Sequence, residues 1–207
     1  MIKLIAFLGN YGKEYESTRH NVAWQFASSL SFYDRLNWQK KFKGLYAQVY
    51  SSDFVQWIAS DKSFDYLPEK FYFLKPETYM NLSGESIGEL CQFFKIKSDE
   101  VLVVHDELEL PMGTVSLKWS GGLGGHNGLR STKANLGTAD FWRLRFGISR
   151  PADKNIADYV LSNFSSDERI VLSQIFPPAG ELLAKVLLSK DAQRLLPEWS
   201  KKKLCAD

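Results

Sequence analysis

Short runs of apolar, β-branched and aromatic residues recur along most of the chain, separated by polar and glycine-containing segments. Runs of this length and composition predict β-strands. The last run alternates strictly, which places Trp142 and Leu144 on the core face of its strand and Arg143 and Arg145 on the opposite face. The predicted strands cover residues 2–8, 44–50, 54–59, 71–74, 101–105, 114–119 and 142–148.

Between several of these strands, apolar residues repeat every three or four positions, which predicts helices with one buried face. The first helix follows Thr18 and carries His20 in its first turn. Its apolar stripe consists of Val22, Phe26, Leu30 and Tyr33. Further helices are predicted from Ser83, from the glycine-rich segment 121–128 to Gly137, and over residues 165–176 and 179–196.

The alternation of strands and helices predicts an α/β fold in which a twisted mixed β-sheet is covered by helices, and residues 1–207 are expected to form one domain. The 44% hydrophobic and 24% charged residues are typical of a soluble globular protein. No apolar run approaches the ~20 residues of a membrane-spanning helix. The apolar N-terminus leads into Gly9-Asn10-Tyr11-Gly12 without a signal-peptide cleavage pattern, so we interpret it as a buried strand.

Charge and cysteine content narrow the expected partners and compartment. The net charge of only +2 gives no reason to expect nucleic-acid binding by the molecule as a whole, so any such surface must be local. Cys91 and Cys205 are too far apart in sequence to suggest a disulfide framework, which favours the reducing cytoplasm.

The chain contains three histidines, His20, His105 and His126, which limits the candidates for an imidazole base. A histidine in the first turn of a helix is biased towards its neutral form, because the helix N-terminus disfavours the imidazolium, so His20 is the best candidate. Asp106, at the end of a buried strand, could orient the imidazole and stabilise its cation. An alternative stays open, in which His20 is a polar first-turn residue and Asp106 forms a turn.

Other chemistries have weaker support. A zinc site would use the three histidines, but no closely spaced ligand pair occurs. A Gly-x-Ser-x-Gly nucleophile motif is absent and Cys91 lies on an apolar helix face, so attack by an activated water is favoured. The segment 121–128 is neither a Walker A loop nor a dinucleotide-binding motif. It could hold an anion or only open a helix, with Asn127 as its N-cap; Asn10 and Asn81 could likewise be turn residues.

Five fragments, taken in order, carry a family resemblance. They are Gly9-Asn10-x-Gly12, Thr18-Arg19-His20-Asn21, Lys75-Pro76-x-Thr78-Tyr79-Met80-Asn81-Leu82-Ser83-Gly84, His105-Asp106-Glu107-Leu108-x-Leu110-Pro111-x-Gly113 and Gly121-Gly122-x-Gly124-Gly125-His126-Asn127-Gly128. With the shorter runs Arg143-Leu144-Arg145-x-Gly147-Ile148 and Asp153-Lys154-Asn155, they resemble the bacterial peptidyl-tRNA hydrolase family. The resemblance covers residues 7–160 and then fades.

The resemblance implies the fold of that family and a role for each matching residue. His20 matches the catalytic base and Asp106 the carboxylate that orients it. Asn127 and Asn10 match the amides that position water and substrate. The residues that match the peptide-binding side are Asn81, Met80, Tyr15 and His126.

The resemblance also implies the reaction and the partner. The family hydrolyses the ester between a peptide, or an N-blocked aminoacyl group, and the 3′ end of tRNA, and so recycles tRNA from prematurely dissociated peptidyl-tRNA during translation. It works as a cytoplasmic monomer that needs no cofactor, metal or membrane. An enzyme that serves all elongator tRNAs must hold phosphates rather than read bases. Lys118, Arg143 and Lys154 match the side that binds the acceptor stem, with a solvated charged face as the alternative.

One departure from the family pattern affects the site. The usual Gly-Leu-Gly-Asn-Pro-Gly stretch is here residues 7–12, with Phe7 and Tyr11 in place of the first glycine and the proline. Proline restricts its own backbone and that of the preceding residue, so Tyr11 leaves the presentation of Asn10 less predetermined.

Two other functions stay open. One is a catalytically silent RNA-binding relative, against which the presence of both His20 and Asp106 argues. The other is a different ester or amide hydrolase that uses the same base and needs no basic surface.

Overall fold

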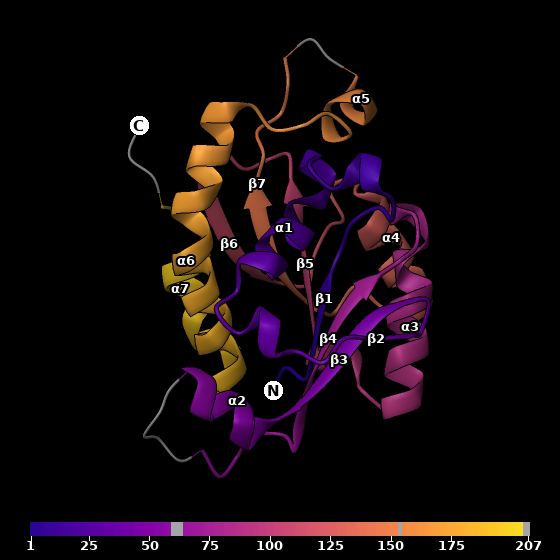
Figure 1. The fold of residues 1–207 in the computed structure, drawn as a ribbon, viewed down its shortest axis with the longest axis vertical. Helices are drawn as coiled ribbons and strands as arrows, with labels where there is room; N and C mark the ends of the chain where they lie inside the picture. The colour runs from indigo at the N-terminus through magenta and orange to yellow at the C-terminus, as the bar shows by residue number, and fades with distance from the viewer. Residues whose placement is uncertain (59–63, 153–154, 205–207) are drawn as a thin grey trace.

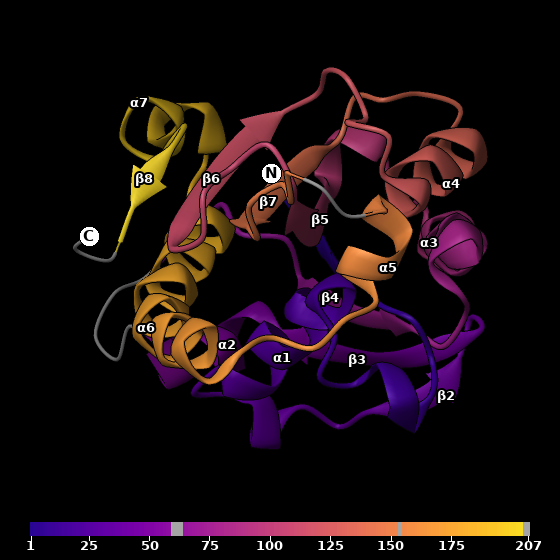
Figure 2. The same ribbon diagram turned by 90° about the horizontal axis from the view of Figure 1, so that it is seen from above.

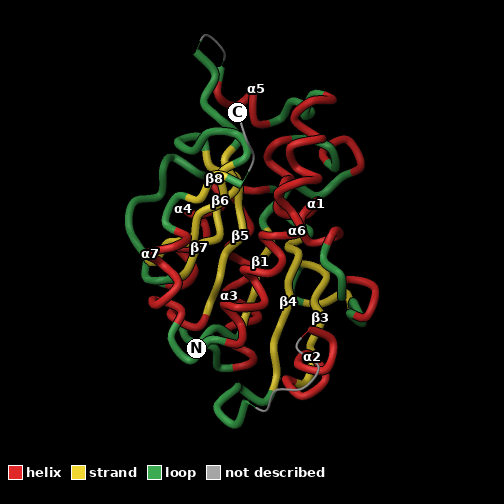
Figure 3. The backbone as a smooth tube through the Cα atoms, turned by 90° about the vertical axis from the view of Figure 1, so that its left-hand side faces the viewer, coloured by secondary structure: helices red, strands yellow, loops and turns green. Residues whose placement is uncertain are grey.

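Eight strands form one mixed sheet in the computed structural model, which describes residues 1–58, 64–152 and 155–204 (Figure 1). The strand order is β2-β3-β4-β1-β5-β7-β6-β8, and the four central strands β4, β1, β5 and β7 run parallel while the outer pairs are antiparallel. Figure 3 shows the strands side by side. Their bounds are β1 Leu4–Phe7, β2 Gln39–Lys41, β3 Gly44–Tyr50, β4 Lys70–Pro76, β5 Val101–Glu107, β6 Thr114–Trp119, β7 Trp142–Gly147 and β8 Lys202–Lys203.

Helices cover both faces of the sheet, as predicted (Figure 2). Helices α3 and α4 pack on one face, and α1, α2, α6 and α7 contribute to the core on the other. Helix α5 lies over the upper edge of the sheet in Figure 1. The bounds are α1 Val22–Ser29, α2 Ser51–Ile58, α3 Ser83–Phe94, α4 Asn127–Leu136, α5 Ile156–Val160, α6 Ser166–Leu188 and α7 Leu196–Trp199.

The central strands β1 and β5 are apolar at successive positions because both of their faces are covered. Along β5, Leu102 and Val104 belong to one core and Val101 and Val103 to the other. The apolar run ends where the strand reaches the edge of the sheet, and polar residues follow. In sheets of this kind, side chains at the carboxyl ends of parallel strands commonly build a site.

The strand predicted at residues 54–59 is wrong, because residues 51–58 form helix α2; residue 59 lies outside the described residues. Phe54, Trp57 and Ile58 are spaced as on one helix face, and they contact the same core. The strand was predicted because this short run is rich in aromatic and β-branched residues, which are common in strands.

The two helices predicted over residues 165–176 and 179–196 are wrong in their boundary. Helix α6 continues through Pro177 and Pro178 and ends at Leu188. A proline inside a helix costs about 3 kcal/mol, because it lacks the N–H group and crowds the preceding turn. Burial of apolar side chains on both sides of the prolines, among them Ile175, Ala179 and Leu182, offsets that cost.

Helix α6 is the one described helix that is long and apolar enough to cross a membrane by length and composition. Its buried side chains pack against the sheet in the main core, as in a core helix of a soluble protein. The first turn of the helix also carries two acidic residues, Asp167 and Glu168, so its apolar stretch does not begin at its N-terminus.

The first helix is shorter than predicted. A 3-10 turn over Arg19–Asn21 carries His20, and α1 then ends at Ser29, so Tyr33 belongs to a separate 3-10 turn. From this turn the His20 ring contacts Asp106 at the carboxyl end of β5.

Candidate active site

The carboxyl ends of β1, β4 and β5 border a cavity of about 680 Å³. Asn10 follows β1, Met80 follows β4 in the turn before α3, and Asp106 is the penultimate residue of β5. The structure places beside this cavity every residue predicted for catalysis or peptide binding, namely Asn10, Tyr15, His20, Met80, Asn81, Asp106, His126 and Asn127.

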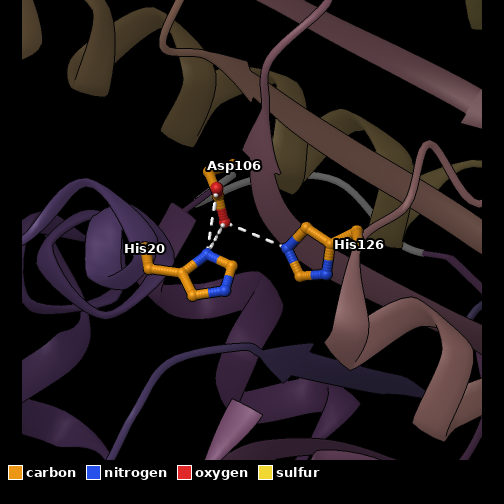
Figure 4. A group of neighbouring side chains, drawn as sticks. All are labelled: His20, Asp106 and His126. Atoms are coloured by element: carbon orange, nitrogen blue, oxygen red, sulfur yellow. Dashed lines mark hydrogen bonds and ion pairs between the residues drawn. The ribbon is translucent and has the colours of Figure 1, made fainter. Parts of the chain in front are cut away.

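His20 and Asp106 form a direct, buried contact across the edge of the sheet (Figure 4). The Nδ1 atom of His20 lies 2.9 Å from Oδ1 and 3.0 Å from Oδ2 of Asp106. A carboxylate can only accept a hydrogen bond, so Nδ1 carries the proton. Nε2 points away from Asp106 in Figure 4 and has no hydrogen-bond partner among the described residues, which leaves it available to a molecule in the cavity.

His126 is a second partner of Asp106, which the sequence did not indicate. Its Nε2 lies 3.0 Å from Asp106 Oδ1. Its Nδ1 accepts hydrogen bonds from the backbone N–H groups of Gly128 and Leu129, so His126 is the N-cap of α4. The sequence interpretation that made Asn127 the N-cap is therefore wrong. Because Nδ1 accepts, the proton is on Nε2 and is donated to the carboxylate.

The two imidazoles determine the charge of Asp106. Burial would raise the pKa of Asp106, but the charges and hydrogen bonds of His20 and His126 hold it well below its usual range. The carboxylate is therefore ionised at neutral pH, although the residue is only 2% exposed.

The carboxylate in turn acts on His20. Burial lowers the pKa of His20, but the charge and hydrogen bond of Asp106 outweigh burial and raise this pKa above its usual value. The sequence-based expectation that the helix start biases His20 towards the neutral form is thus wrong in sign, because a carboxylate in contact acts more strongly than a helix terminus.

His105 is buried and contacts both Asp106 and His126. Its Nδ1 donates to the backbone oxygen of Asp106 at 2.6 Å, and its ring packs edge-on against His126. Burial, followed by the nearby His126, holds the pKa of His105 well below its usual range, so this imidazole is neutral. Its burial and low pKa make it a weak base, so it serves as packing and is not a candidate base.

Asn10 is held in place without the proline of the family pattern. Its backbone N–H donates to the side chain of Asn21, whose amide donates back to the Asn10 carbonyl. The Asn10 Oδ1 atom accepts the N–H of Met80 at 2.7 Å. That bond identifies the oxygen, and Asn10 lines the cavity. Two neighbours thus fix the conformation that Tyr11 leaves open.

The other predicted residues occupy different parts of the wall. Asn127 is exposed at the start of α4, and its Oδ1 accepts from Arg130, which leaves its amide donors free. Asn81 is exposed, Met80 is buried, and Tyr15 packs edge-on against Tyr79. The sequence analysis did not identify the part of the cavity wall formed by α5 and the residue after it, which includes Ile156 and Leu161. Both residues are apolar, and the structure shows that both are exposed.

The ligand atoms of His20, Asp106 and His126 lie within 4.8 Å of one another, close enough to hold a metal ion. Both imidazole nitrogens nearest the carboxylate carry protons that they donate to it; for His126 the acceptor role of Nδ1 requires this tautomer. A cation would have to displace both protons, so this geometry favours the hydrogen-bonded network.

Cys91 is no candidate nucleophile. It lies in α3, away from the cavity, and burial raises the pKa of its thiol to about 12. The thiolate that nucleophilic attack requires is therefore scarce at neutral pH.

Arg143 is buried, which contradicts the alternative that it belongs to a solvated charged face. It lies on the predicted face of β7, but the glycine-rich loop covers that face and leaves the residue 1% exposed. Its guanidinium donates to the carbonyls of Gly121 and Gly122 at 2.9 and 2.5 Å. Arg143 therefore holds the loop. Lys118 is half-buried at the end of β6, and Lys154 lies outside the described residues.

Replacing Arg143 by leucine is expected to lower the free energy of unfolding by roughly 2–3 kcal/mol, because the loop carbonyls lose their donor. Urea denaturation measures the change. Arg150→Leu is the control, since its ion pair with Glu109 is exposed and should contribute less than about 1 kcal/mol. Equal stabilities of the two variants would contradict the assigned role.

Arg19 anchors the cavity wall to the turn that carries His20. Its guanidinium forms an ion pair with Glu168 at 2.6 Å and donates to the Asn163 carbonyl at 2.6 Å and the Ser162 hydroxyl at 2.8 Å. It also lies 4.5 Å from the ring centre of Tyr159. The residues that follow α5 are thereby tied to the neighbour of the candidate base.

Comparison with known proteins agrees with this geometry. Residues 4–206 match the model of a family described as peptidyl-tRNA hydrolase. The chain is 46% identical to the peptidyl-tRNA hydrolase of Treponema pallidum, covering 98% of this chain and 96% of the relative, and 40% identical to that of Neisseria meningitidis, covering 94% and 96%. The crystal structure of peptidyl-tRNA hydrolase from Acinetobacter baumannii superposes with a TM-score of 0.74 at 32% identity, covering 95% and 91%.

Proposed function

The chain belongs to the peptidyl-tRNA hydrolase family and releases tRNA from peptidyl-tRNA, and we propose that it does so through a water molecule activated by His20. The observation that carries this mechanism is the contact between His20 and Asp106. It keeps the proton on Nδ1 and leaves Nε2 unpaired beside the cavity.

The proposed reaction has two proton transfers. His20 Nε2 takes a proton from water as the water oxygen bonds to the ester carbonyl carbon. Asp106 stabilises the imidazolium that forms. The bond between that carbon and the 3′ oxygen of the ribose then breaks, and the imidazolium returns the proton to the departing oxygen. The products are a peptide acid and tRNA with a free 3′ end.

Two amides are proposed to stabilise the oxyanion. The Nδ2 donors of Asn10 and Asn127 belong to residues on the cavity wall, and the oxygen of each side chain is already engaged. A fixed donor of this kind contributes roughly 3 kcal/mol to transition-state stabilisation in other enzymes. Met80, Asn81, Tyr15 and His126 are proposed to line the peptide side.

We propose that the acceptor stem is held through its phosphates at Lys118 and residues beside it, and that Lys154 belongs to the same side. The enzyme is further proposed to work in the cytoplasm as a monomer without metal, cofactor or membrane. Arg143 is not proposed as a phosphate ligand, since it is buried and both of its terminal nitrogens donate to the loop.

The test uses purified protein and N-acetyl-aminoacyl-tRNA, with release of free tRNA as the measurement. Turnover that is unchanged by excess EDTA is the expected result. Binding of tRNA without cleavage would instead indicate the silent relative. Cleavage of a simple ester as efficiently as the tRNA ester would indicate a different hydrolase, and inactivation by EDTA would overturn the metal-free mechanism.

A further inference from the structure

One face of the sheet, at its β7–β6–β8 edge, carries basic residues on neighbouring strands. Arg145 of β7 pairs with Ser116 of β6, and Lys118 lies two residues along the same strand. On the other side of β6, Lys203 pairs with Thr114 and Lys202 with Val115. Lys201 directly precedes β8. Continuing this register by one residue places Lys201 opposite Ser116, on the face of Lys118, and the charge of Lys201 acts on the pKa of Lys118.

Hydrogen bonds join these strands at Ser116. Arg145 Nη2 donates to the Ser116 hydroxyl at 2.7 Å, and that hydroxyl donates to the carbonyl of Ser200, the residue before Lys201. Figures 2 and 3 both show β8 beside β6. The backbone that carries Lys201 is therefore attached to the strand that carries Lys118.

The charges on this face are poorly balanced. Arg145 pairs with Glu107 at 3.3 Å, but neither Lys118 nor Lys201 has an ion pair within the part of the chain that the structure describes. Burial and then the positive charges of Arg145, Arg143 and Lys201 lower the pKa of Lys118, while Glu107 acts the other way. The carboxylate of Glu107 is already paired with Arg145, so the remaining like charges gain from binding an anion.

The opposite face of β8 is different. Lys202 pairs with Glu198 at 2.6 Å and lies 4.4 Å from the ring centre of Trp199. Lys201, directly before β8, and Lys202, its first residue, thus have different surroundings. Among the described residues Lys202 has an ion pair and Lys201 has none.

This basic face adjoins the active-site cavity. Glu107, the partner of Arg145, lines the cavity, as do Gly124 and Gly125 of the loop that follows β6. A polyanion whose 3′ end enters the cavity can extend from Glu107 past Arg145 towards Lys118, which pairs with Arg143 two positions earlier on β7.

We infer that Lys201 extends the tRNA-binding surface, forming with Lys118 and Arg145 a basic strip that contacts phosphates of the acceptor arm. This inference rests on the proposed function. It assigns a substrate-binding role to the C-terminal strand, where the family resemblance fades.

The experiment compares Lys201→Gln with Lys202→Gln, which removes the same charge from the other face. Binding of deacylated tRNA is measured over a series of salt concentrations. Lys201→Gln is expected to raise Kd about fivefold at ~0.1 M salt and to reduce the slope of log Kd against log salt by about one, as for the loss of one phosphate contact. Lys202→Gln should stay within about twofold of the wild type, because its ion pair is exposed. Thermal unfolding verifies that both variants fold.

A short substrate separates this inference from the proposed function. N-acetyl-aminoacyl-adenosine lacks the acceptor helix, so Lys201→Gln should cleave it with the wild-type kcat/KM. Equal losses in both variants, an unchanged salt slope, or a loss on the short substrate would overturn the role of Lys201. Failure of the wild type to hydrolyse either ester would instead overturn the proposed function.

Discussion

Asp106→Asn is expected to lower kcat for N-acetyl-aminoacyl-tRNA by about 10³- to 10⁴-fold. The carboxylate accepts from both His20 and His126. An amide has one oxygen, so its NH₂ group can face His20 and force the imidazole proton onto Nε2. That nitrogen could then no longer accept a proton from water. Single-turnover hydrolysis measures the effect.

The same substitution should move the pH profile. Only neutral His20 accepts a proton, so the rate falls as the pH drops through the pKa of His20. Asp106 raises this pKa, and therefore its removal lowers it. The acidic limb of kcat against pH is expected to shift to lower pH in Asp106→Asn.

Asp158→Asn provides the control for Asp106→Asn. Asp158 is an exposed acid on α5, so the variant loses the same charge near the cavity without touching the imidazoles. It should keep the wild-type kcat and acidic limb. The assignment fails if a folded Asp106→Asn retains wild-type turnover, or if its acidic limb moves to higher pH.

His20→Ala is expected to lower kcat by about 10³-fold, within the range of a lost general base. Affinity for deacylated tRNA should stay near the wild-type value, because His20 is not among the residues proposed to hold the tRNA phosphates. Hydrolysis and binding are measured on the same preparation.

Rescue separates loss of the base from loss of structure. Added imidazole can enter the space left by the His20 side chain and should restore part of the activity of His20→Ala. Unimpaired turnover in a folded His20→Ala protein would contradict the mechanism.

The sequence predicted elements well where one strong pattern decides them. The strands at 44–50 and 114–119 have the predicted bounds, and α4 ends before Gly137, whose positive φ suits glycine. Prediction failed where tertiary packing decides. Helix α6 passes two prolines because both of its halves are buried, and the short edge strands β2 and β8 depend on pairing with a neighbour.

The site was predictable as residue types but not as a network. His20 and Asp106 lie 86 positions apart, and periodicity does not report a distance between elements. His126 was named for the peptide side, whereas its two ring nitrogens serve the helix start and the carboxylate. The alternation of residues in β7 predicted the face of Arg143 correctly, but it did not predict that the glycine-rich loop covers this face. The carbonyls of Gly121 and Gly122 need a hydrogen-bond donor, and Arg143 supplies it.

The anchoring of α5 by Arg19 bears on inhibitor design. The cavity wall is fastened after α5 by Arg19 to Asn163 and within α5 by the Tyr159 hydroxyl, which donates to the Ile148 carbonyl at 2.5 Å. A wall held at two points loses little conformational entropy when a ligand binds. Rigid compounds that match the apolar surface of α5 should therefore give higher ligand efficiency than flexible peptide mimics of the same size.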